Sequence, residues 1–350
     1  MNISITNECN RRCAYCFQKD WYLSKKAGLP DDETVKEMPV SEFAALCDWA
    51  PKVKVMKVLG GEPLMHSRLT EMMDTAIAKG KQMAFISNIS VEGEAFDRFA
   101  EYCRREGFIK SVLINTDYPK KQEGIFKRNL EVLCRTQTEL SFSTTLLPGE
   151  KAIADSQKRI AECADVYRSA RGSIEGFRVR LAPFCPNPTN STGFQIYDFT
   201  DDIISFVNGL APTGIEEYGF DCPVNLCELR SDFIDAARNM QFTVRTRQCS
   251  PETGMPFDIL VDHSVIWCSS ANFLRLNDWR DYPNFDTAKH ELSKQYYAWW
   301  RSHGYGEKCR SCGKLNPGLC SGFCIAKSQN LRRIPIRSVN TEIEAGKHAL

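Results

Sequence analysis

The sequence predicts an α/β fold, an open barrel of parallel strands followed by a smaller cysteine-rich domain. Over about the first 210 residues, short apolar runs rich in β-branched residues alternate with longer amphipathic stretches. Near residue 212 the alternation ceases, and from there to Cys324 cysteines occur in clusters among Gly and Pro. With 350 residues and 43% hydrophobic content, the chain can bury a large core. We therefore expect one sizeable domain followed by a smaller domain that is stabilised by bound metal.

Six strands and five helices are expected in the first part of the chain. The predicted strands are Asn2–Thr6, Val53–Leu59, Met83–Ser87, Ser111–Asn115, Leu140–Leu146 and Phe177–Ala182. The predicted helices are Ser41–Trp49, Arg68–Lys79, Glu94–Arg105, Glu123–Arg135 and Ala152–Arg168. Six parallel strands with helices outside make an open α/β barrel, whose functional groups lie on loops at the carboxyl ends of the strands.

The charge balance and the cysteine content indicate which binding partners and which cellular compartment the protein has. The 45 Lys and Arg residues nearly cancel the 44 Asp and Glu residues, so no net field attracts nucleic acid or an anionic membrane. We find neither a signal peptide nor a membrane span and expect a cytoplasmic protein. In a reducing compartment, 16 cysteines indicate metal ligation or catalysis. A secreted disulfide scaffold is disfavoured because such scaffolds are typically short.

Three cysteines with the spacing Cys9-x3-Cys13-x2-Cys16 directly follow the first predicted strand. Iron–sulfur clusters ordinarily take four Cys ligands, so a local set of three leaves one iron free for an exogenous ligand. The alternatives are a zinc knuckle that lacks a ligand, or three unrelated buried thiols. The spacing favours a three-thiolate cluster with an open coordination position.

These residues resemble the signature of the radical S-adenosylmethionine (SAM) superfamily, in which an aromatic residue, here Tyr15, usually precedes the last cysteine. The resemblance covers roughly residues 1–210 and implies a partial (βα)6 barrel. It also implies that the unique iron of a 4Fe-4S cluster chelates the amino and carboxylate groups of SAM. An electron from the cluster would then break the sulfonium bond, giving methionine and a 5′-deoxyadenosyl radical that removes a hydrogen atom from the substrate.

Polar motifs after the next three strands agree with this resemblance. Gly60, Gly61, Glu62 and Pro63 resemble the family's GGEP motif, which contacts the SAM amino group, and glycines let a backbone approach closely. After the third strand, Ser87-Asn88 resembles a Ser/Thr-Asn-Gly turn near the ribose, with Ile89 in place of Gly. After the fourth come Asn115, Thr116 and Asp117, polar groups that could face the cavity, although we favour a solvated strand end.

The C-terminal cysteines Cys309, Cys312, Cys320 and Cys324 form two close pairs around a Gly/Pro turn. Alone, this pattern would favour a zinc site. Beside the radical SAM motif, it resembles a SPASM domain.

A SPASM domain also carries upstream cysteines at a turn of the form Asp-Gly-x-Val-x-x-Cys. Asp262 to Cys268 match that turn with His263 in place of Gly, and Cys249 precedes it. The resemblance implies one auxiliary 4Fe-4S cluster, as in the shortened twitch variant, or two if Cys222 or Cys227 completes a second ligand set. The expected domains are the barrel (1–211), a SPASM/twitch-like domain (212–328) and a tail (329–350). The remaining helical cysteines (Cys47, Cys103, Cys134, Cys163) are interpreted as small buried hydrophobes.

Radical SAM enzymes with such C-terminal domains mostly modify ribosomally made peptides. We therefore expect an oxidoreductase-type maturase that crosslinks or epimerises a precursor peptide. It would have a separate leader-binding protein and an external electron donor such as flavodoxin or ferredoxin. Cys222 is a candidate hydrogen-atom donor to a substrate radical. The alternatives are a small-molecule dehydrogenase and a non-catalytic iron–sulfur or zinc protein. Asp117, Glu216 and Asp221 are candidate acids or bases that sequence does not rank.

Overall fold

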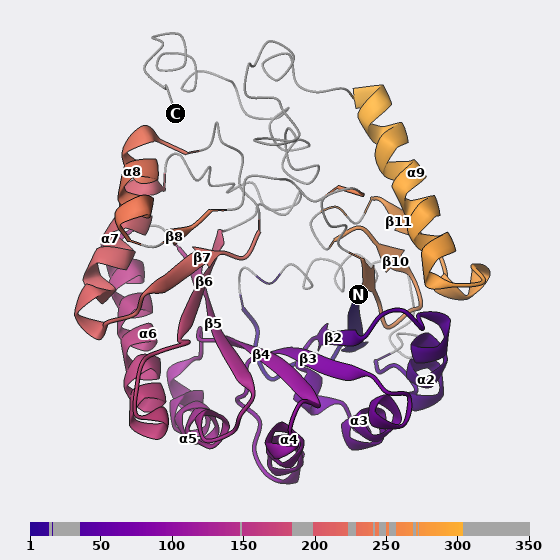
Figure 1. Cartoon of the computed structure of the whole chain (residues 1–350), viewed down its shortest axis with the longest axis horizontal. Coiled ribbons are helices and arrows are strands. Elements are labelled where there is room, and N and C mark those ends of the chain that lie inside the picture. Colours follow the sequence, from indigo (N-terminus) through magenta and orange to yellow (C-terminus); the bar gives the residue numbers. More distant parts are fainter. Residues whose placement is uncertain are drawn as a thin grey trace.

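The computed structural model shows one curved sheet with helices on its outer side (Figure 1). It describes residues 1–13, 16, 36–147, 149–183, 199–222, 229–240, 242–244, 250–251, 257–268, 271 and 273–303. Among these residues the sheet has the strand order β11-β10-β9-β1-β2-β3-β4-β5-β6-β7-β8. The fold is thus α/β with a mainly parallel sheet.

The six strands predicted for the barrel are confirmed, and each neighbouring pair is parallel. They are β1 (Asn2–Thr6), β2 (Val55–Gly60), β3 (Gln82–Ser87), β4 (Ile109–Asn115), β5 (Glu139–Leu146) and β6 (Arg178–Pro183). Because all six run the same way, their carboxyl ends meet at one edge of the sheet, which is where ligands bind in such folds.

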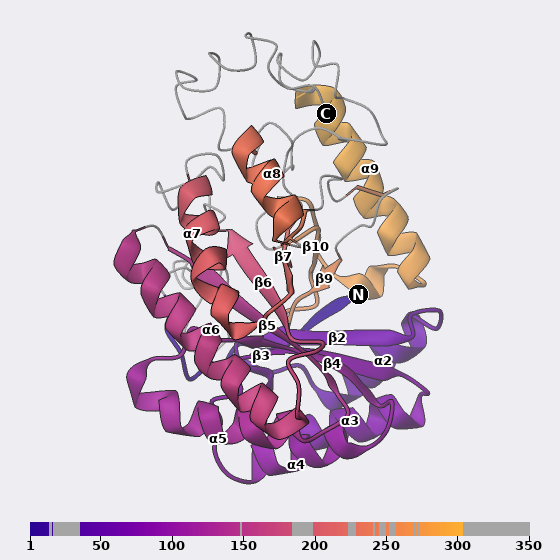
Figure 2. The same ribbon diagram turned by 60° about the vertical axis from the view of Figure 1, so that its left-hand side comes forward.

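The predicted helices are also confirmed and cover the outer face of the sheet (Figures 1 and 2). They are α2 (Val40–Trp49), α3 (Leu69–Ala78), α4 (Glu94–Arg104), α5 (Glu123–Cys134) and α6 (Glu150–Arg171). The core lies between the two layers, where Phe85 of β3 meets Phe99 of α4 edge-on at 4.9 Å between ring centres. The cysteines of these helices, Cys47, Cys103, Cys134 and Cys163, are buried as predicted. Among the described residues, no helix has the length and apolar character needed to cross a bilayer.

The expectation that the strand and helix alternation stops near residue 212 is wrong. After α7 (Thr200–Leu210), β7 (Glu217–Phe220), α8 (Ser231–Asn239) and β8 (Phe242–Thr243) extend the sheet with two further parallel strands. At the other edge, β9 (Asp258–Ile259) pairs in parallel with β1, and β10 (Val265–Ile266) and β11 (Arg275–Leu276) follow antiparallel. Helix α9 (Phe285–His303) lies beside β11 (Figure 1). Strands of two to four residues carry too little periodicity to be recognised in sequence. The division into domains at residue 211 stays a prediction.

A buried lysine stabilises the junction between α2 and β2. Lys81 is 6% exposed, and its Nζ donates hydrogen bonds to the carbonyls of Ala50, Pro51 and Val53 at 2.8, 3.1 and 2.8 Å. Lys81→Met keeps the apolar stem but leaves these acceptors without their donor. We expect the free energy of unfolding in urea to fall by about 2–3 kcal/mol.

Lys79→Met is the matched control, because Lys79 forms a solvent-exposed ion pair with Asp48 at 2.6 Å. Such pairs contribute less than about 1 kcal/mol. Equal losses in the Lys79 and Lys81 variants would contradict the assigned role of Lys81.

Candidate active site

The cysteine loop follows β1 at the carboxyl edge of the sheet. The amide of Arg11 donates to Cys9 Sγ at 3.4 Å, and the amide of Cys16 donates to the carbonyl of Cys13 at 3.2 Å. Cys9 is exposed to solvent, but the surrounding protein still removes enough hydration to raise the pKa of its thiol to about 11. The Arg11 amide opposes this shift, whereas the charges of Glu62, Cys13 and Cys16 add to it.

This donor set fits an iron–sulfur cluster better than a single metal ion. Among the residues that the structure describes, no three Cys, His, Asp or Glu side chains are grouped so that they could bind a single metal ion. A cubane does not require such grouping, because each thiolate binds a different iron. The donors of this loop are three neighbouring thiols, with no carboxylate or imidazole among them. Thiolates are the ligands that iron–sulfur clusters bind.

The two glycines after β2 allow that loop to touch the segment leading to Cys9. Gly60 has φ of +145°, a conformation that favours glycine. Gly61 donates its N–H to the carbonyl of Thr6 at 2.7 Å, and a Cβ on Gly61 would lie 2.1 Å from the carbonyl oxygen of Glu8. The backbones of the two loops are therefore in direct contact.

Glu62 joins the ends of β2 and β3. The residue is 1% exposed, and its Oε1 accepts hydrogen bonds from Ser87 Oγ at 2.6 Å and from the Leu64 amide at 3.1 Å. Its Oε2 accepts the amide of Asn88 at 2.7 Å. Burial raises the pKa of Glu62, and the hydrogen bonds oppose that rise. Pro63 begins the short helix Pro63–Met65 that follows. These hydrogen bonds fix the loop after β2 to the loop after β3.

Asn88 and Ile89 complete the turn after β3. Asn88 Nδ2 lies 4.0 Å from Cys9 Sγ and donates to Asn10 Oδ1 at 2.9 Å. Ile89 has φ of +48° and is fully buried, so a β-branched residue adopts a left-handed backbone conformation here. Asn129 Nδ2 of α5 donates to the carbonyl of Ile89 at 2.7 Å and holds this strained turn.

A cavity of about 600 Å³ opens beside the cysteine loop, and Cys9, Cys13 and Asp117 line it. Asp117 accepts hydrogen bonds from Thr144 Oγ1 and from the Thr145 amide, both at 2.9 Å. Its side chain is 8% exposed. Interpreting Asn115 to Asp117 as a solvated strand end is therefore wrong, since the carboxylate is held in the cavity wall.

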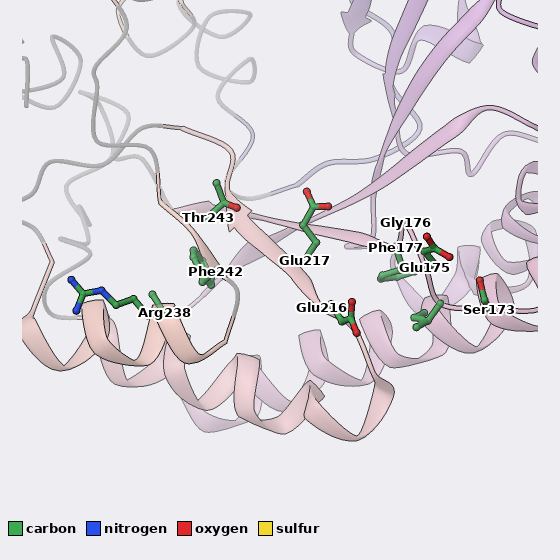
Figure 3. A pocket seen from close by; sticks show the side chains of 11 residues that line it. Ser173, Glu175, Gly176, Phe177, Glu216, Glu217, Arg238, Phe242 and Thr243 are labelled. Atoms are coloured by element: carbon green, nitrogen blue, oxygen red, sulfur yellow. The ribbon is translucent and has the colours of Figure 1, made fainter. Parts of the chain in front are cut away.

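The other two acidic candidates, Asp221 and Glu216, lie at opposite ends of β7. Asp221 directly follows β7, and its Oδ2 accepts a hydrogen bond from Ser143 Oγ at 2.8 Å. Glu216 directly precedes β7 and lines a separate cavity of about 780 Å³ with Glu175 and Arg238 (Figure 3). That cavity lies at the amino ends of the strands, away from the cysteine loop. Asp117 and Asp221 thus remain candidates for chemistry at the cysteines, whereas Glu216 does not.

Two of the later cysteines are described by the structure. Cys222 is exposed and follows Asp221, while Cys268 is half-buried after β10. The remaining predicted binding residues lie outside the described residues. They are Tyr15, Cys227, Cys249, Cys309, Cys312, Cys320 and Cys324.

Arg11 is the residue of this site that sequence reasoning missed. It is 8% exposed, and its guanidinium reaches the ends of β3 and β4, whereas the adjacent Arg12 is exposed. A buried arginine next to an exposed one carries no periodic signal, so only the folded loop distinguishes them.

Comparison with known proteins agrees with this geometry. The model of the radical SAM superfamily matches residues 3–139. A GTP 3′,8-cyclase of Helicobacter pylori is 22% identical over 288 residues, covering 79% of this chain and 76% of the relative. A GTP 3′,8-cyclase of Staphylococcus haemolyticus is 35% identical over 77 residues, covering 21% of each protein.

Solved structures share the fold over nearly the whole chain. Streptococcus suis SuiB bound to the precursor peptide SuiA matches with a TM-score of 0.63 and 13% identity, covering 97% of this chain and 75% of SuiB. SuiB bound to S-adenosylmethionine matches with a TM-score of 0.58 and 15% identity, covering 97% and 76%. These likenesses show the fold, and the match to the radical SAM superfamily model is confined to residues 3–139.

Proposed function

We propose that this chain is a radical SAM enzyme whose SAM-binding 4Fe-4S cluster is held by Cys9, Cys13 and Cys16. The match of residues 3–139 to the radical SAM superfamily model supports the cluster and SAM as cofactors. The cluster would supply the electron that cleaves SAM to methionine and a 5′-deoxyadenosyl radical. The observation that carries the proposal is the joining of three loops after β1, β2 and β3 around Cys9, through Gly61, Glu62 and Asn88.

Three residues around Cys9 have different structural roles in this proposed site. Gly61 brings the β2 loop against the backbone that leads to Cys9. Glu62 fixes that loop to Ser87 and Asn88, so that the three loops cannot move independently. Asn88 then places its side-chain amide beside the Cys9 sulfur. Preorganised donors of this kind require no rearrangement when a charged ligand binds.

For the substrate, we propose a ribosomally made precursor peptide that is crosslinked or epimerised. The support is the fold shared with SuiB along 97% of this chain, since SuiB was solved with a precursor peptide. We further propose that Cys249, Cys268, Cys309, Cys312, Cys320 and Cys324, with Cys227, hold one or two auxiliary clusters. A separate leader-binding protein and a flavodoxin or ferredoxin would complete the system.

A purine nucleotide is the second candidate substrate, because the similarity to a GTP 3′,8-cyclase spans 79% of this chain. The two are separated by anaerobic incubation of the reconstituted protein with SAM and dithionite. One sample receives GTP, and the other receives a synthetic candidate precursor peptide. We expect the peptide to raise 5′-deoxyadenosine formation and to change in mass or stereochemistry, and GTP to be recovered intact. Conversion of GTP with no change in the peptide would overturn the peptide assignment.

Cys222 is proposed to donate a hydrogen atom to the substrate radical when the product is an epimer. The S–H bond breaks as the new C–H bond forms, and one electron from the external donor with one proton from solvent returns the resulting thiyl radical to the thiol. Cys222 is exposed at the carboxyl end of β7, next to Asp221. We expect Cys222→Ala to keep SAM cleavage and to lose the D-amino acid, which chiral amino-acid analysis measures. Full turnover to epimerised product in the variant would refute the role.

A further inference from the structure

The cavity beside the cysteine loop has a second wall, formed by α6 and the end of β5. Ala152, Ser156 and Arg159 of α6 line it, together with Leu147, which directly follows β5. At about 600 Å³, the cavity has the volume of an ordinary small-ligand pocket. None of the residues proposed to bind the cluster or SAM belongs to this wall.

The guanidinium of Arg159 keeps most of its hydrogen-bonding capacity. Its Nη2 donates to Ser156 Oγ at 3.2 Å and lies 3.7 Å from Asp117 Oδ1, beyond hydrogen-bond distance. Its Nε is buried and has no hydrogen-bond partner among the residues that the structure describes. A buried donor without an acceptor is unfavourable. Turning the fork into the cavity would relieve the buried Nε and present paired N–H groups to a ligand.

Asp117 does not occupy these donors, because its carboxylate is held by β5. It accepts hydrogen bonds from Thr144 Oγ1 and from the Thr145 amide, both at 2.9 Å. The Asp117 side chain is 8% exposed, whereas that of Arg159 is 27% exposed. The carboxylate is thus a fixed part of the wall, and the guanidinium is the group that a ligand in the cavity can reach.

An apolar surface lies on the same wall. Leu147 is 38% exposed, which is unusual for a large hydrophobic side chain in this structure. Arg12 and Lys121 add two solvent-exposed cations to the described lining, while Asp155 adds an exposed carboxylate. This lining is suited to a ligand that carries an anionic group next to an apolar one.

We propose that Arg159 binds a carboxylate of the peptide substrate and that Leu147 contacts an apolar side chain next to it. Arg159 thereby selects which segment of the peptide lies beside the proposed cluster. The carboxylate belongs either to an acidic side chain or to the C-terminus of the peptide, since both present the same planar acceptor to a guanidinium. The inference rests on the proposed peptide-modifying function.

Blocked dipeptides test this by calorimetric titration of the anaerobically reconstituted full chain, with saturating SAM and no reductant. The probes are N-acetyl-leucyl-glutamic acid amide, its neutral isostere N-acetyl-leucyl-glutamine amide, and N-acetyl-leucyl-leucine with a free carboxylate. We expect one of the two acidic probes to bind at least about 10-fold more tightly than the neutral one, because a charge-assisted pair is lost in the isostere. Which acidic probe binds identifies the source of the carboxylate. Equal binding of all three probes would overturn the proposal.

Arg159→Met removes the donors but keeps an apolar stem. We expect this variant to bind the acidic probe as weakly as the neutral one and to bind the neutral probe as the wild type does. Lys158→Met is the matched control, because Lys158 precedes Arg159 on α6 but is 76% exposed and not part of the described lining. It is expected to keep the wild-type preference. A purely structural role of Arg159 would weaken all three probes alike, and that result would also overturn the proposal.

The same titrations separate other ligands of Arg159 from a peptide. Binding of the acidic probe only in the absence of SAM would assign Arg159 to the SAM carboxylate and overturn the proposal. Binding of GTP that depends on Arg159, with no binding of either acidic probe, would overturn it as well. An iron-loaded wild type that forms no 5′-deoxyadenosine with SAM and dithionite contradicts the proposed function itself. Normal SAM cleavage without a preference for a carboxylate contradicts the Arg159 inference alone.

Discussion

Gly61→Ala is expected to lower SAM cleavage by about 100-fold or more, because it displaces the segment that leads to Cys9. The added Cβ would lie 2.1 Å from the carbonyl oxygen and 2.6 Å from the carbonyl carbon of Glu8. Both are backbone atoms and cannot rotate away as the end of a flexible side chain does. Iron content after anaerobic reconstitution and the initial rate of 5′-deoxyadenosine formation measure the effect.

Gly124→Ala is the control for this substitution. Gly124 lies in the first turn of α5, and nothing is within 4 Å of an added Cβ there. We expect wild-type SAM cleavage and a stability that is unchanged or higher by up to about 1 kcal/mol. Gly61→Ala with the iron content and turnover of the wild type would contradict the close approach of the two loops.

Glu62→Gln is expected to separate the β2 and β3 loops. The carboxylate accepts hydrogen bonds from two backbone amides and the Ser87 hydroxyl, on both of its oxygens. A glutamine side chain has only one acceptor oxygen, so its NH2 group faces an amide donor on the other side. Leaving buried donors without acceptors costs about 1–3 kcal/mol, and we expect a loss of that size in urea unfolding. SAM cleavage is expected to fall with it.

Glu71→Gln tests whether any lost carboxylate has this effect. Glu71 forms an exposed ion pair with Arg68 on the surface of α3. We expect no measurable change in stability or SAM cleavage. If Glu62→Gln behaved like Glu71→Gln, Glu62 would not be the link between the two loops.

The barrel was predictable from sequence, whereas the strands that widen it were not. The runs that form β2 to β6 are long enough to show buried β-branched residues between polar turns. By contrast, β8 to β11 contain two residues each and exist because they pair with an established sheet edge. Such pairing depends on tertiary contacts that no local pattern records.

Two departures from family motifs have a structural explanation that sequence did not supply. Ile89 and His263 both stand where the motifs that they resemble have Gly, and both have a positive φ, at 48° and 71°. The His263 ring contacts the Glu42 carboxylate of α2, and Arg280 Nη2 lies 3.0 Å from its Nδ1. Side-chain contacts thus compensate for backbone strain, so the turn survives without the residue that usually makes it.

We propose that Cys9, Cys13 and Cys16 hold a cluster that cleaves SAM. The most direct measurement is anaerobic reconstitution with iron and sulfide counts, followed by SAM and dithionite, for the wild type and a variant with all three cysteines changed to Ala. We predict 5′-deoxyadenosine from the wild type only, and about four fewer irons per chain in the variant. An iron-loaded wild type that forms no 5′-deoxyadenosine, or a variant that forms as much as the wild type, would contradict the claim.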